Sequence, residues 1–181
     1  MAKAEPKSKP KAKTPKKKLV EAQVRAYFEA MGRRDINALG ECWSEDGVDE
    51  VVPVGVLRGR AEIQEFFRGL FAAVPDLETT IVRVVADQRH AALEWRMSGT
   101  FNGEPFQGVD PTGKAASMRG LDLCEVEGGL IVANTSYYDG AEFARQVGLM
   151  PPQDSAAERA LKSAFNTVTK VRKAIAERTE G

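Results

Sequence analysis

Asp122 is the residue of this 181-residue chain whose surroundings most suggest chemistry. It lies in the segment GLDLCEVEGGL, where alternating residues and a Gly-Gly pair are typical of a β-hairpin. A turn centred on Gly128 would place Asp122 opposite Asn134. Burial among apolar side chains raises the pKa of a carboxyl group, and its neutral form can donate a hydrogen bond to a carbonyl or enolate oxygen.

The two faces of this predicted hairpin lead to opposite expectations for Asp122. Even-numbered positions share one face and comprise Met118, Asp122, Cys124, Val126, Val132, Asn134, Ser136 and Tyr138. The odd-numbered face carries Leu121, Leu123 and Ile131. If the even face is concave, Asp122 is buried; if the odd face is concave, Asp122 is solvated. The alternation alone leaves both arrangements open.

Tyr27 is the second candidate for chemistry. It belongs to an apolar stripe at helical spacing that begins after Leu19 and comprises Val20, Val24, Tyr27, Phe28 and Met31. A tyrosine on such a stripe can offer its hydroxyl to a ligand, or it can be an ordinary core residue whose hydroxyl is satisfied within the protein. The periodicity supports both interpretations.

Several further side chains are expected to line a ligand cavity. They are the aromatic residues Trp43, Phe67, Trp95 and Phe106 and the polar residues Asn134 and Ser136. Aromatic residues at helical or strand spacing are equally typical of a plain hydrophobic core, so each has a structural alternative.

The composition of the chain disfavours a metal-binding site and a Ser–His–Asp catalytic triad. The chain has one histidine, His90, and two cysteines, Cys42 and Cys124, which are too few for a Cys/His metal cluster. A Ser–His–Asp arrangement is disfavoured for the same reason. We therefore expect no metal ion and no organic cofactor.

The elements that must position these residues follow from the hydrophobic periods. Beyond the first helix, helices are predicted after Asp35, after Gly59 as far as Pro75, from about Gly140, and after Asp154. Strands are predicted over residues 48–56, with a break at Pro53 and Gly55, and over 77–86, 89–101, 115–126 and 130–139. Helices followed by an antiparallel meander predict an α+β fold in which a curved sheet covers the helices.

The two ends of the chain differ from the middle in charge. Residues 1–18 hold eight lysines and one glutamate, a local charge of +7, so the rest of the chain carries −7. The Lys/Pro/Ala-rich segment predicts a disordered tail that is a solubilising segment or a weak contact for an anionic surface or nucleic acid. No apolar run is long enough for a membrane span or a signal-peptide core, which favours a cytoplasmic protein.

Four segments resemble the nuclear transport factor 2-like superfamily, which includes steroid Δ-isomerases, SnoaL-like polyketide cyclases and limonene-epoxide hydrolases. They are YFEAMGRRDINALGECW (27–43), RGRAEIQEFFRGL (58–70), SGTFNGEPFQGVDPTGK (98–114) and GLDLCEVEGGLIVANTSYYD (120–139). The resemblance covers roughly residues 19–150. It implies a cone-shaped α+β fold with helices packed in the concave face of a curved antiparallel sheet, and a homodimer.

The resemblance also assigns roles to particular positions. Tyr27 and Asp122 match the residues that form the oxyanion hole of steroid isomerases, whose aspartic acid is kept neutral. The base of that group matches Val51 or Val52, with Asp49 and Glu50 close by, and a slip of one residue would reverse their side-chain direction. In the cyclases the base position matches Ser136, a poor base without a histidine. Neither family position therefore carries a carboxylate, and the candidate bases are Asp49, Glu50 or an ordered water molecule.

Two functional hypotheses follow. The first is a cofactor-independent cyclase or isomerase that holds the enolate of a cyclic or polyketide-like carbonyl compound with Tyr27 and Asp122. The second is a non-catalytic module of the same fold that binds a small apolar ligand or a protein.

Under both hypotheses, the chain divides into a tail (1–18), a SnoaL-like domain (19–150) and a C-terminal amphipathic helix (151–181). The apolar stripe of that helix must be covered by its own domain or by a second copy.

Overall fold

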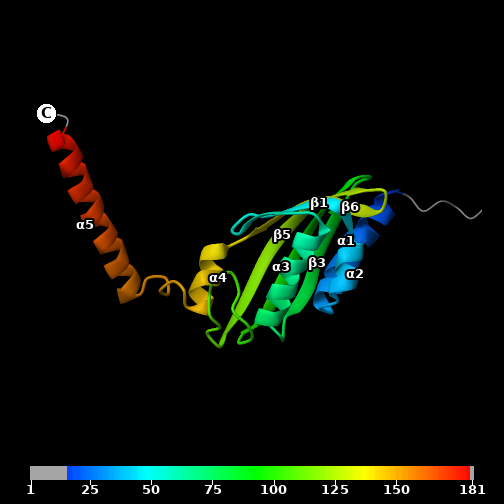
Figure 1. Ribbon diagram of the computed structural model, residues 1–181, viewed down its shortest axis with the longest axis horizontal. Helices are drawn as coiled ribbons and strands as arrows, with labels where there is room; N and C mark the ends of the chain where they lie inside the picture. The colour runs from blue at the N-terminus through cyan, green and yellow to red at the C-terminus, as the bar shows by residue number, and fades with distance from the viewer. Residues whose placement is uncertain (1–15, 180–181) are drawn as a thin grey trace, which may run out of the picture.

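A computed structural model describes residues 16–179 and has the α+β architecture that the sequence predicts (Figure 1). The helices are α1 (Lys16–Gly32), α2 (Ile36–Glu41), α3 (Arg60–Ala73), α4 (Gly140–Val147) and α5 (Ala156–Thr179). The strands are β1 (Trp43–Val51), β2 (Gly55–Arg58), β3 (Glu78–Ala86), β4 (His90–Phe101), β5 (Lys114–Glu127) and β6 (Leu130–Tyr138). Most of the predicted lysine-rich tail lies outside the described residues, and its last three lysines begin α1.

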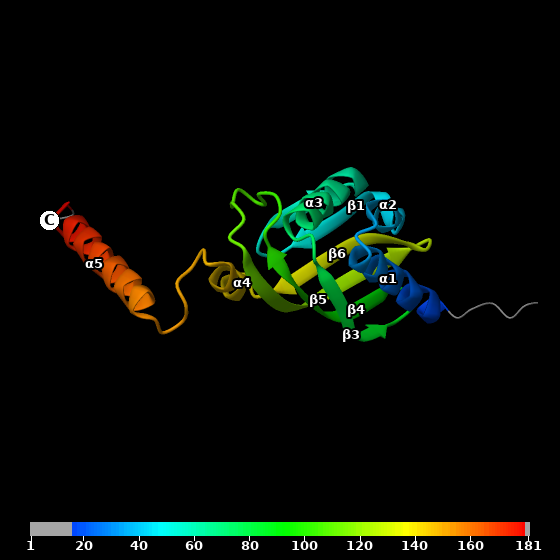
Figure 2. The ribbon, with the colours of Figure 1, turned by 90° about the horizontal axis from the view of Figure 1, so that it is seen from below.

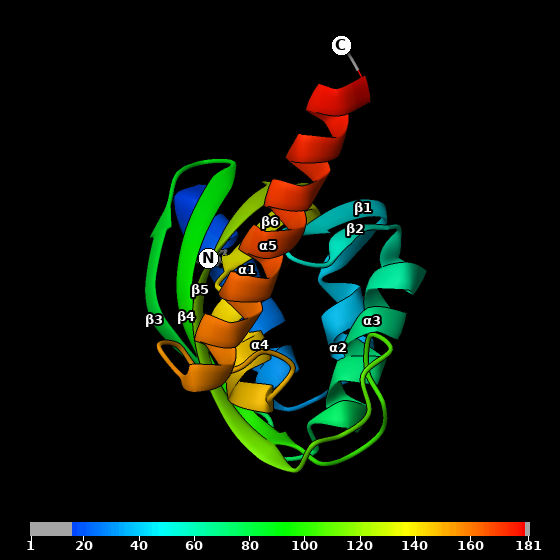
Figure 3. The ribbon, with the colours of Figure 1, turned by 90° about the vertical axis from the view of Figure 1, so that its left-hand side faces the viewer.

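The six strands form one curved sheet, in the order β2-β1-β6-β5-β4-β3, with helices packed against its concave face. Helix α1 crosses β3 to β6, while α2 and α3 pack on one another and on β1. Figure 3 shows the strands β3, β4 and β5 curving along one side of the molecule, with α2 and α3 opposite them. Tyr27, Phe28, Trp43 and Leu93 are among the fully buried residues of the core between these layers.

The segment predicted as one broken strand over residues 48–56 forms parts of two strands. Pro53 lies in the turn that joins β1 to β2, which pair antiparallel. The other edge of β1 pairs with β6, and this pairing is parallel. The expectation of a wholly antiparallel sheet is therefore wrong at this edge, because β1 and β6 are far apart in the chain and no hairpin forces them to run in opposite directions.

The β5–β6 hairpin has a different register from the one predicted. Its turn contains only Gly128 and Gly129, both with positive φ (58° and 88°), as a tight two-residue hairpin turn requires. A register shift next to Glu125 then places Asp122 opposite Ser136, and Asn134 opposite Cys124. Beyond the irregularity even-numbered residues still share a face, whereas next to the turn Val126 pairs with Ile131, an odd-numbered residue that is fully buried. Leu121 and Leu123 are exposed, so the even face is the concave one.

Helix N-termini were read correctly in one case and incorrectly in another. Asp35 caps α2 by accepting a hydrogen bond at 3.0 Å from the backbone N–H of Ala38. Asp154, the predicted cap of the last helix, has a φ of +58° instead. Ser155 caps α5 in its place, because its hydroxyl accepts the backbone N–H of Glu158 at 3.1 Å.

Helix α5 extends away from the sheet and the other helices beyond α4 (Figures 1 and 2). Its apolar residues are accordingly solvent-exposed, with Phe165 70% exposed and Leu161 56% exposed. An ion pair between Glu158 and Arg145 joins the start of α5 to α4. The described part of the domain therefore does not cover the stripe. None of the helices between residues 16 and 179 has the length and apolar character needed to cross a membrane.

Candidate functional site

A cavity of about 430 Å³ lies between the concave face of the sheet and the helices. Its walls are mostly apolar and come from α1, α3, α4, four strands and the loop before β5. The carboxyl, hydroxyl and amide groups in the lining belong to Tyr27, Asp49, Gln107, Asp122, Asn134, Ser98, Ser136 and Tyr138. A volume of this size is typical of a site for a small organic molecule.

Asp122 lies on the cavity-facing side of β5 and is 3% exposed. Its Oδ1 accepts hydrogen bonds at 2.7 Å from both the Trp95 Nε1–H and the Ser136 hydroxyl. Its Oδ2 accepts a third from the Asn134 amide at 3.0 Å. Burial raises the pKa of Asp122, as expected, while these three hydrogen bonds act in the opposite direction.

Asp49 is the second carboxylate of the cavity and is fully buried. The parallel pairing of β1 and β6 sets it beside Asn134, whose amide donates a 3.0 Å hydrogen bond to Asp49 Oδ1. Its Oδ2 is buried without a hydrogen-bond partner among the described residues. Desolvation, reinforced by the negative charge of Asp122, raises the pKa of Asp49 to about 7.

The side chain of Asn134 joins the two carboxyl groups. Because its amide nitrogen lies 3.0 Å from Asp49 Oδ1 and 3.0 Å from Asp122 Oδ2, these oxygens are at most about 6 Å apart. The Cys124 thiol donates a 3.2 Å hydrogen bond to the Asn134 carbonyl oxygen, which directs the amide nitrogen toward the carboxylates. Two acidic groups this close do not ionise independently, so one titrates at a higher pH than the other.

Tyr27 lies on α1 and lines the same cavity. Its ring packs edge-on against Phe28, Trp43 and Phe67, with centroid separations of 5.4, 5.6 and 6.1 Å. No hydrogen bond joins its hydroxyl to another residue in the described range 16–179, so that donor can bond a ligand. Burial and the nearby carboxylates Asp49 and Asp122 raise the pKa of Tyr27 well above its ordinary value, so the hydroxyl keeps its proton.

The remaining predicted site residues divide into two groups. Phe67, Trp95, Phe106, Asn134 and Ser136 line the cavity. Trp43 does not line it; it is the first residue of β1 rather than part of α2, and it is buried in the core behind Tyr27.

Glu50 is the other predicted site residue that the structure places elsewhere. It is exposed on the opposite face of β1 from Asp49. Of the two candidate bases, the structure therefore brings Asp49 and not Glu50 into the cavity, because the odd-numbered positions of this part of β1 face inward. The sequence signal that could have helped is Gly47, which lies within the irregular pairing between Trp43 and Val48.

Helix α4 contributes cavity residues that the sequence analysis did not select. Phe143 and Val147 line the cavity from this helix, and Leu149 follows directly after it. Asp139 caps α4 by accepting the backbone N–H of Glu142 at 2.9 Å, which turns the chain back over the end of β6. The spacing of Phe143 and Val147, four residues apart on a helix, was the available signal.

The described residues contain no group of three or more His, Cys, Asp or Glu side chains arranged to hold a metal ion. Around its two carboxyl groups the cavity instead provides the Tyr27 hydroxyl and the bridging amide of Asn134. Such a set can bind a ligand oxygen and exchange a proton with a neighbouring atom.

Comparisons with known proteins agree with this architecture. A family model for the SnoaL-like domain matches residues 24–134. A protein from Jannaschia sp. CCS1, described as a SnoaL-like polyketide cyclase, is 17% identical over 78% of this chain and 100% of its own, with a TM-score of 0.69. No curated protein matches the sequence.

Two further solved structures have the same fold. An epoxide hydrolase from M. tuberculosis is 18% identical over 75% of this chain and 93% of its own, with a TM-score of 0.62. A protein of ketosteroid isomerase-like fold from Catenulispora acidiphila, solved with trimethylamine, is 22% identical over 70% of this chain and 92% of its own, with a TM-score of 0.60. These likenesses confirm the predicted fold class.

Proposed function

Because this chain belongs to the SnoaL-like domain family, we propose that it is a cofactor-independent enzyme that moves a proton beside a carbonyl group. The substrate class is a cyclic or polyketide-like carbonyl compound with an apolar body. The reaction class is isomerisation or aldol-type cyclisation through an enolate. The observation that carries this proposal is Asp49, a buried carboxyl group in an apolar cavity with a pKa of about 7 and one oxygen without a partner.

Asp49 takes the role of the base. A carboxyl group with a pKa near neutrality is deprotonated often enough to accept a proton and basic enough to hold it. It removes a proton from the carbon next to the substrate carbonyl, and the C–H electron pair becomes the enolate double bond. In an isomerisation Asp49 then returns the proton to another carbon. In a cyclisation the enolate carbon bonds to a second carbonyl carbon, the C=O π electrons move to that oxygen, and the oxygen takes the proton back from Asp49.

Tyr27 takes the role of the donor to the enolate oxygen. Its hydroxyl keeps its proton, makes no hydrogen bond within the described residues and lines the cavity. A donor of this kind stabilises negative charge where it develops, and a dry cavity strengthens that interaction.

Asp122 fits a supporting role better than the donor role that the resemblance implies. Its two oxygens already accept three hydrogen bonds, which favours its charged form and leaves Tyr27 as the donor. Its negative charge raises the pKa of Asp49, and it holds the amide of Asn134 in place. Asp122 is therefore proposed as the residue that tunes the base.

The test is hydrogen–deuterium exchange at the α-carbon of 2-tetralone in D2O, followed by proton NMR. Wild-type protein should accelerate the exchange, and the rate should rise as the pH passes through about 7 and Asp49 loses its proton. Asp49→Asn should lower the rate at least about 100-fold, and Tyr27→Phe should lower it by about the same factor.

The control for this experiment is Asp87→Asn, an identical change at an exposed carboxylate on the far end of the sheet. It should leave the exchange rate unchanged. Exchange no faster than in buffer, or equal rates in wild type and Asp49→Asn, would contradict the proposed reaction.

The alternative function as an interaction module is supported by α5, and we propose that α5 binds a second copy of the chain. Apolar residues recur at intervals of four and three along it, the spacing of a coiled-coil seam: Ala157, Leu161, Ala164, Val168 and Val171. Sedimentation should give a dimer for wild type and a monomer for Leu161→Ser/Val168→Ser. A monomeric wild type at all concentrations would rule this out.

A further inference from the structure

The cavity has an unusual balance of charge. Two carboxyl groups, Asp49 and Asp122, line it, whereas no lysine, arginine or histidine is among its lining residues in the described part of the chain. The hydrogen-bond donors that reach the two carboxyl groups are neutral: an indole, a hydroxyl and an amide. No ion pair within residues 16–179 involves either one.

Buried charge of one sign is costly unless it is paired. Asp122 is held by three donors, but Asp49 accepts one hydrogen bond, from an amide that it shares with Asp122. Its Oδ2 is buried and has no described partner. The cavity around Asp49 therefore holds no positive charge among the described residues, and the Asp49 Oδ2 accepts no hydrogen bond from them.

The walls around these carboxyl groups are suited to an organic cation. Tyr27, Phe67, Trp95 and Tyr138 line the same cavity and present aromatic rings to it. Aromatic faces attract ammonium groups through their negative π-surface, and the attraction is larger where water is excluded. A cation with an apolar body therefore matches both the charge and the walls. A ligand that enters with its own negative charge matches neither, unlike an enolate formed in place, whose proton stays on Asp49 and leaves the net charge of the cavity unchanged.

We propose that the cavity binds ligands that carry a protonated or quaternary amine on an apolar body, with the nitrogen beside Asp49 and Asp122. This inference concerns the cavity of the proposed enzyme but does not depend on proton transfer. An amine bound in this way occupies the place of the substrate carbonyl, so it should compete with 2-tetralone.

The test compares three probes of similar shape that differ in charge: phenyltrimethylammonium, tert-butylbenzene and benzenesulfonate. Binding to the full chain is measured by NMR titration. Phenyltrimethylammonium should bind at least about 10-fold more tightly than tert-butylbenzene, and benzenesulfonate should not bind. In Asp49→Asn the advantage of the cation should fall about 10-fold, while tert-butylbenzene binds at least as well as before.

The matched control is Glu50→Gln, which neutralises the neighbouring carboxylate on the exposed face of β1. It should keep the full preference for the cation. Equal affinity for the cation and the neutral probe, no binding of either, or an unchanged preference in Asp49→Asn would overturn the proposal. A cation preference without α-exchange would contradict only the proposed reaction, and exchange without a cation preference would contradict only the amine site.

Discussion

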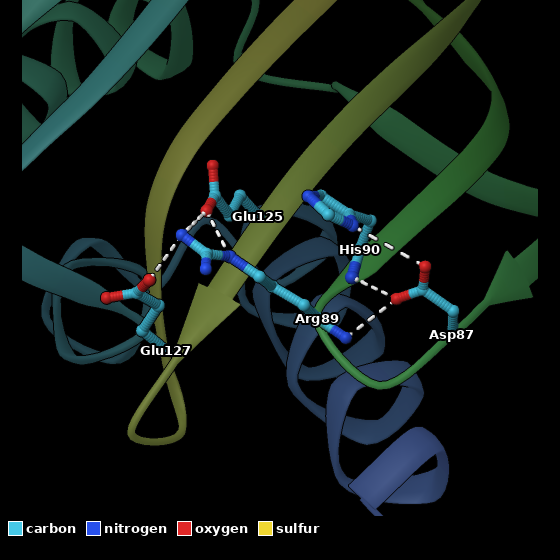
Figure 4. Close-up of polar contacts among 5 residues, drawn as sticks. All are labelled: Asp87, Arg89, His90, Glu125 and Glu127. Carbon is cyan, nitrogen blue, oxygen red and sulfur yellow. Dashed lines mark hydrogen bonds and ion pairs between the residues drawn. The ribbon is translucent and has the colours of Figure 1, made fainter.

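The carboxylates of the cavity and those at the far end of the sheet experience opposite environments. Beside the β3–β4 turn, Asp87 Oδ1 accepts the backbone N–H groups of Arg89 at 2.7 Å and His90 at 2.6 Å (Figure 4). The guanidinium of Arg89 pairs with Glu125 and Glu127 across the sheet. All of this cluster is exposed or half-exposed, whereas Asp49 and Asp122 are buried.

Solvent access, more than the number of hydrogen bonds, decides the direction in which the pKa of these carboxyl groups shifts. Hydrogen bonds from the backbone of His90 and Arg89 hold the pKa of Asp87 below its ordinary value. Asp122 also accepts three hydrogen bonds, yet its pKa is raised, because desolvation outweighs them. Of these carboxyl groups, Asp49 is the one with a pKa of about 7, so it gains and loses its proton near neutral pH.

The largest expected effect is on the pH dependence of stability. The pKa of Asp49 rises from 3.8 to about 7 on folding, so protonation of Asp49 favours the folded state. This contribution to the free energy of unfolding is fully present below pH 3.8 and is lost as the pH rises through 7. Wild type should therefore lose up to about 4 kcal/mol of unfolding free energy relative to Asp49→Asn between these values. Urea unfolding followed by circular dichroism at several pH values measures this difference.

Asp87→Asn sharpens this comparison because the stability that Asp87 contributes changes with pH in the opposite direction from that of Asp49. The pKa of Asp87 is lowered on folding, so its contribution is present above pH 3.8 and is lost as the pH falls. A constant stability difference between wild type and Asp49→Asn from pH 5 to pH 8 would show that Asp49 does not have a raised pKa.

The next effect concerns the bridge between the two buried carboxyl groups. Asn134→Ala removes the hydrogen bonds to both Asp49 and Asp122 and leaves their oxygens buried with fewer donors. The free energy of unfolding should fall by about 2–3 kcal/mol. Thr135→Ala, on the opposite face of β6, is the control; a loss of equal size there would mean that strand packing and not the bridge is responsible.

The smallest effect is expected in the exposed cluster. Arg89→Ala removes the ion pairs to Glu125 and Glu127, which are screened by water and salt. The unfolding midpoint should not change measurably at physiological ionic strength. A loss comparable to that of Asn134→Ala would break the comparison, because it would make the exposed charges as important as the buried ones.

The sequence predicted most of the elements and many of the cavity residues. The stripe through Tyr27 faces the interior, and Phe67, Trp95, Phe106, Asn134 and Ser136 line the cavity. The alternation also groups Asp122 with Asn134 and Ser136 on one face, without deciding whether that face is the concave one. These predictions depend on local periods of hydrophobicity, which a curved sheet over helices must obey. The prediction that Trp43 lines the cavity is wrong, because this residue begins β1 and packs in the core. The choice between Asp49 and Glu50, which the sequence leaves open, depends on the direction of side chains along an irregular strand.

What the sequence by itself determined is therefore the order and type of most elements, the family resemblance and the residues of β5 and β6 that share a face with Asp122; the structure decided that this face is the concave one. The tertiary structure alone decided that Asp49, and not Glu50, enters the cavity beside Asn134, which is 85 residues away in the chain. Side chains alternate between the two faces of a strand. The register shift between Trp43 and Val48 therefore changes which face each later side chain of β1 points to. The raised pKa of Asp49 also requires a distant neighbour, Asp122, which no local pattern brings next to it.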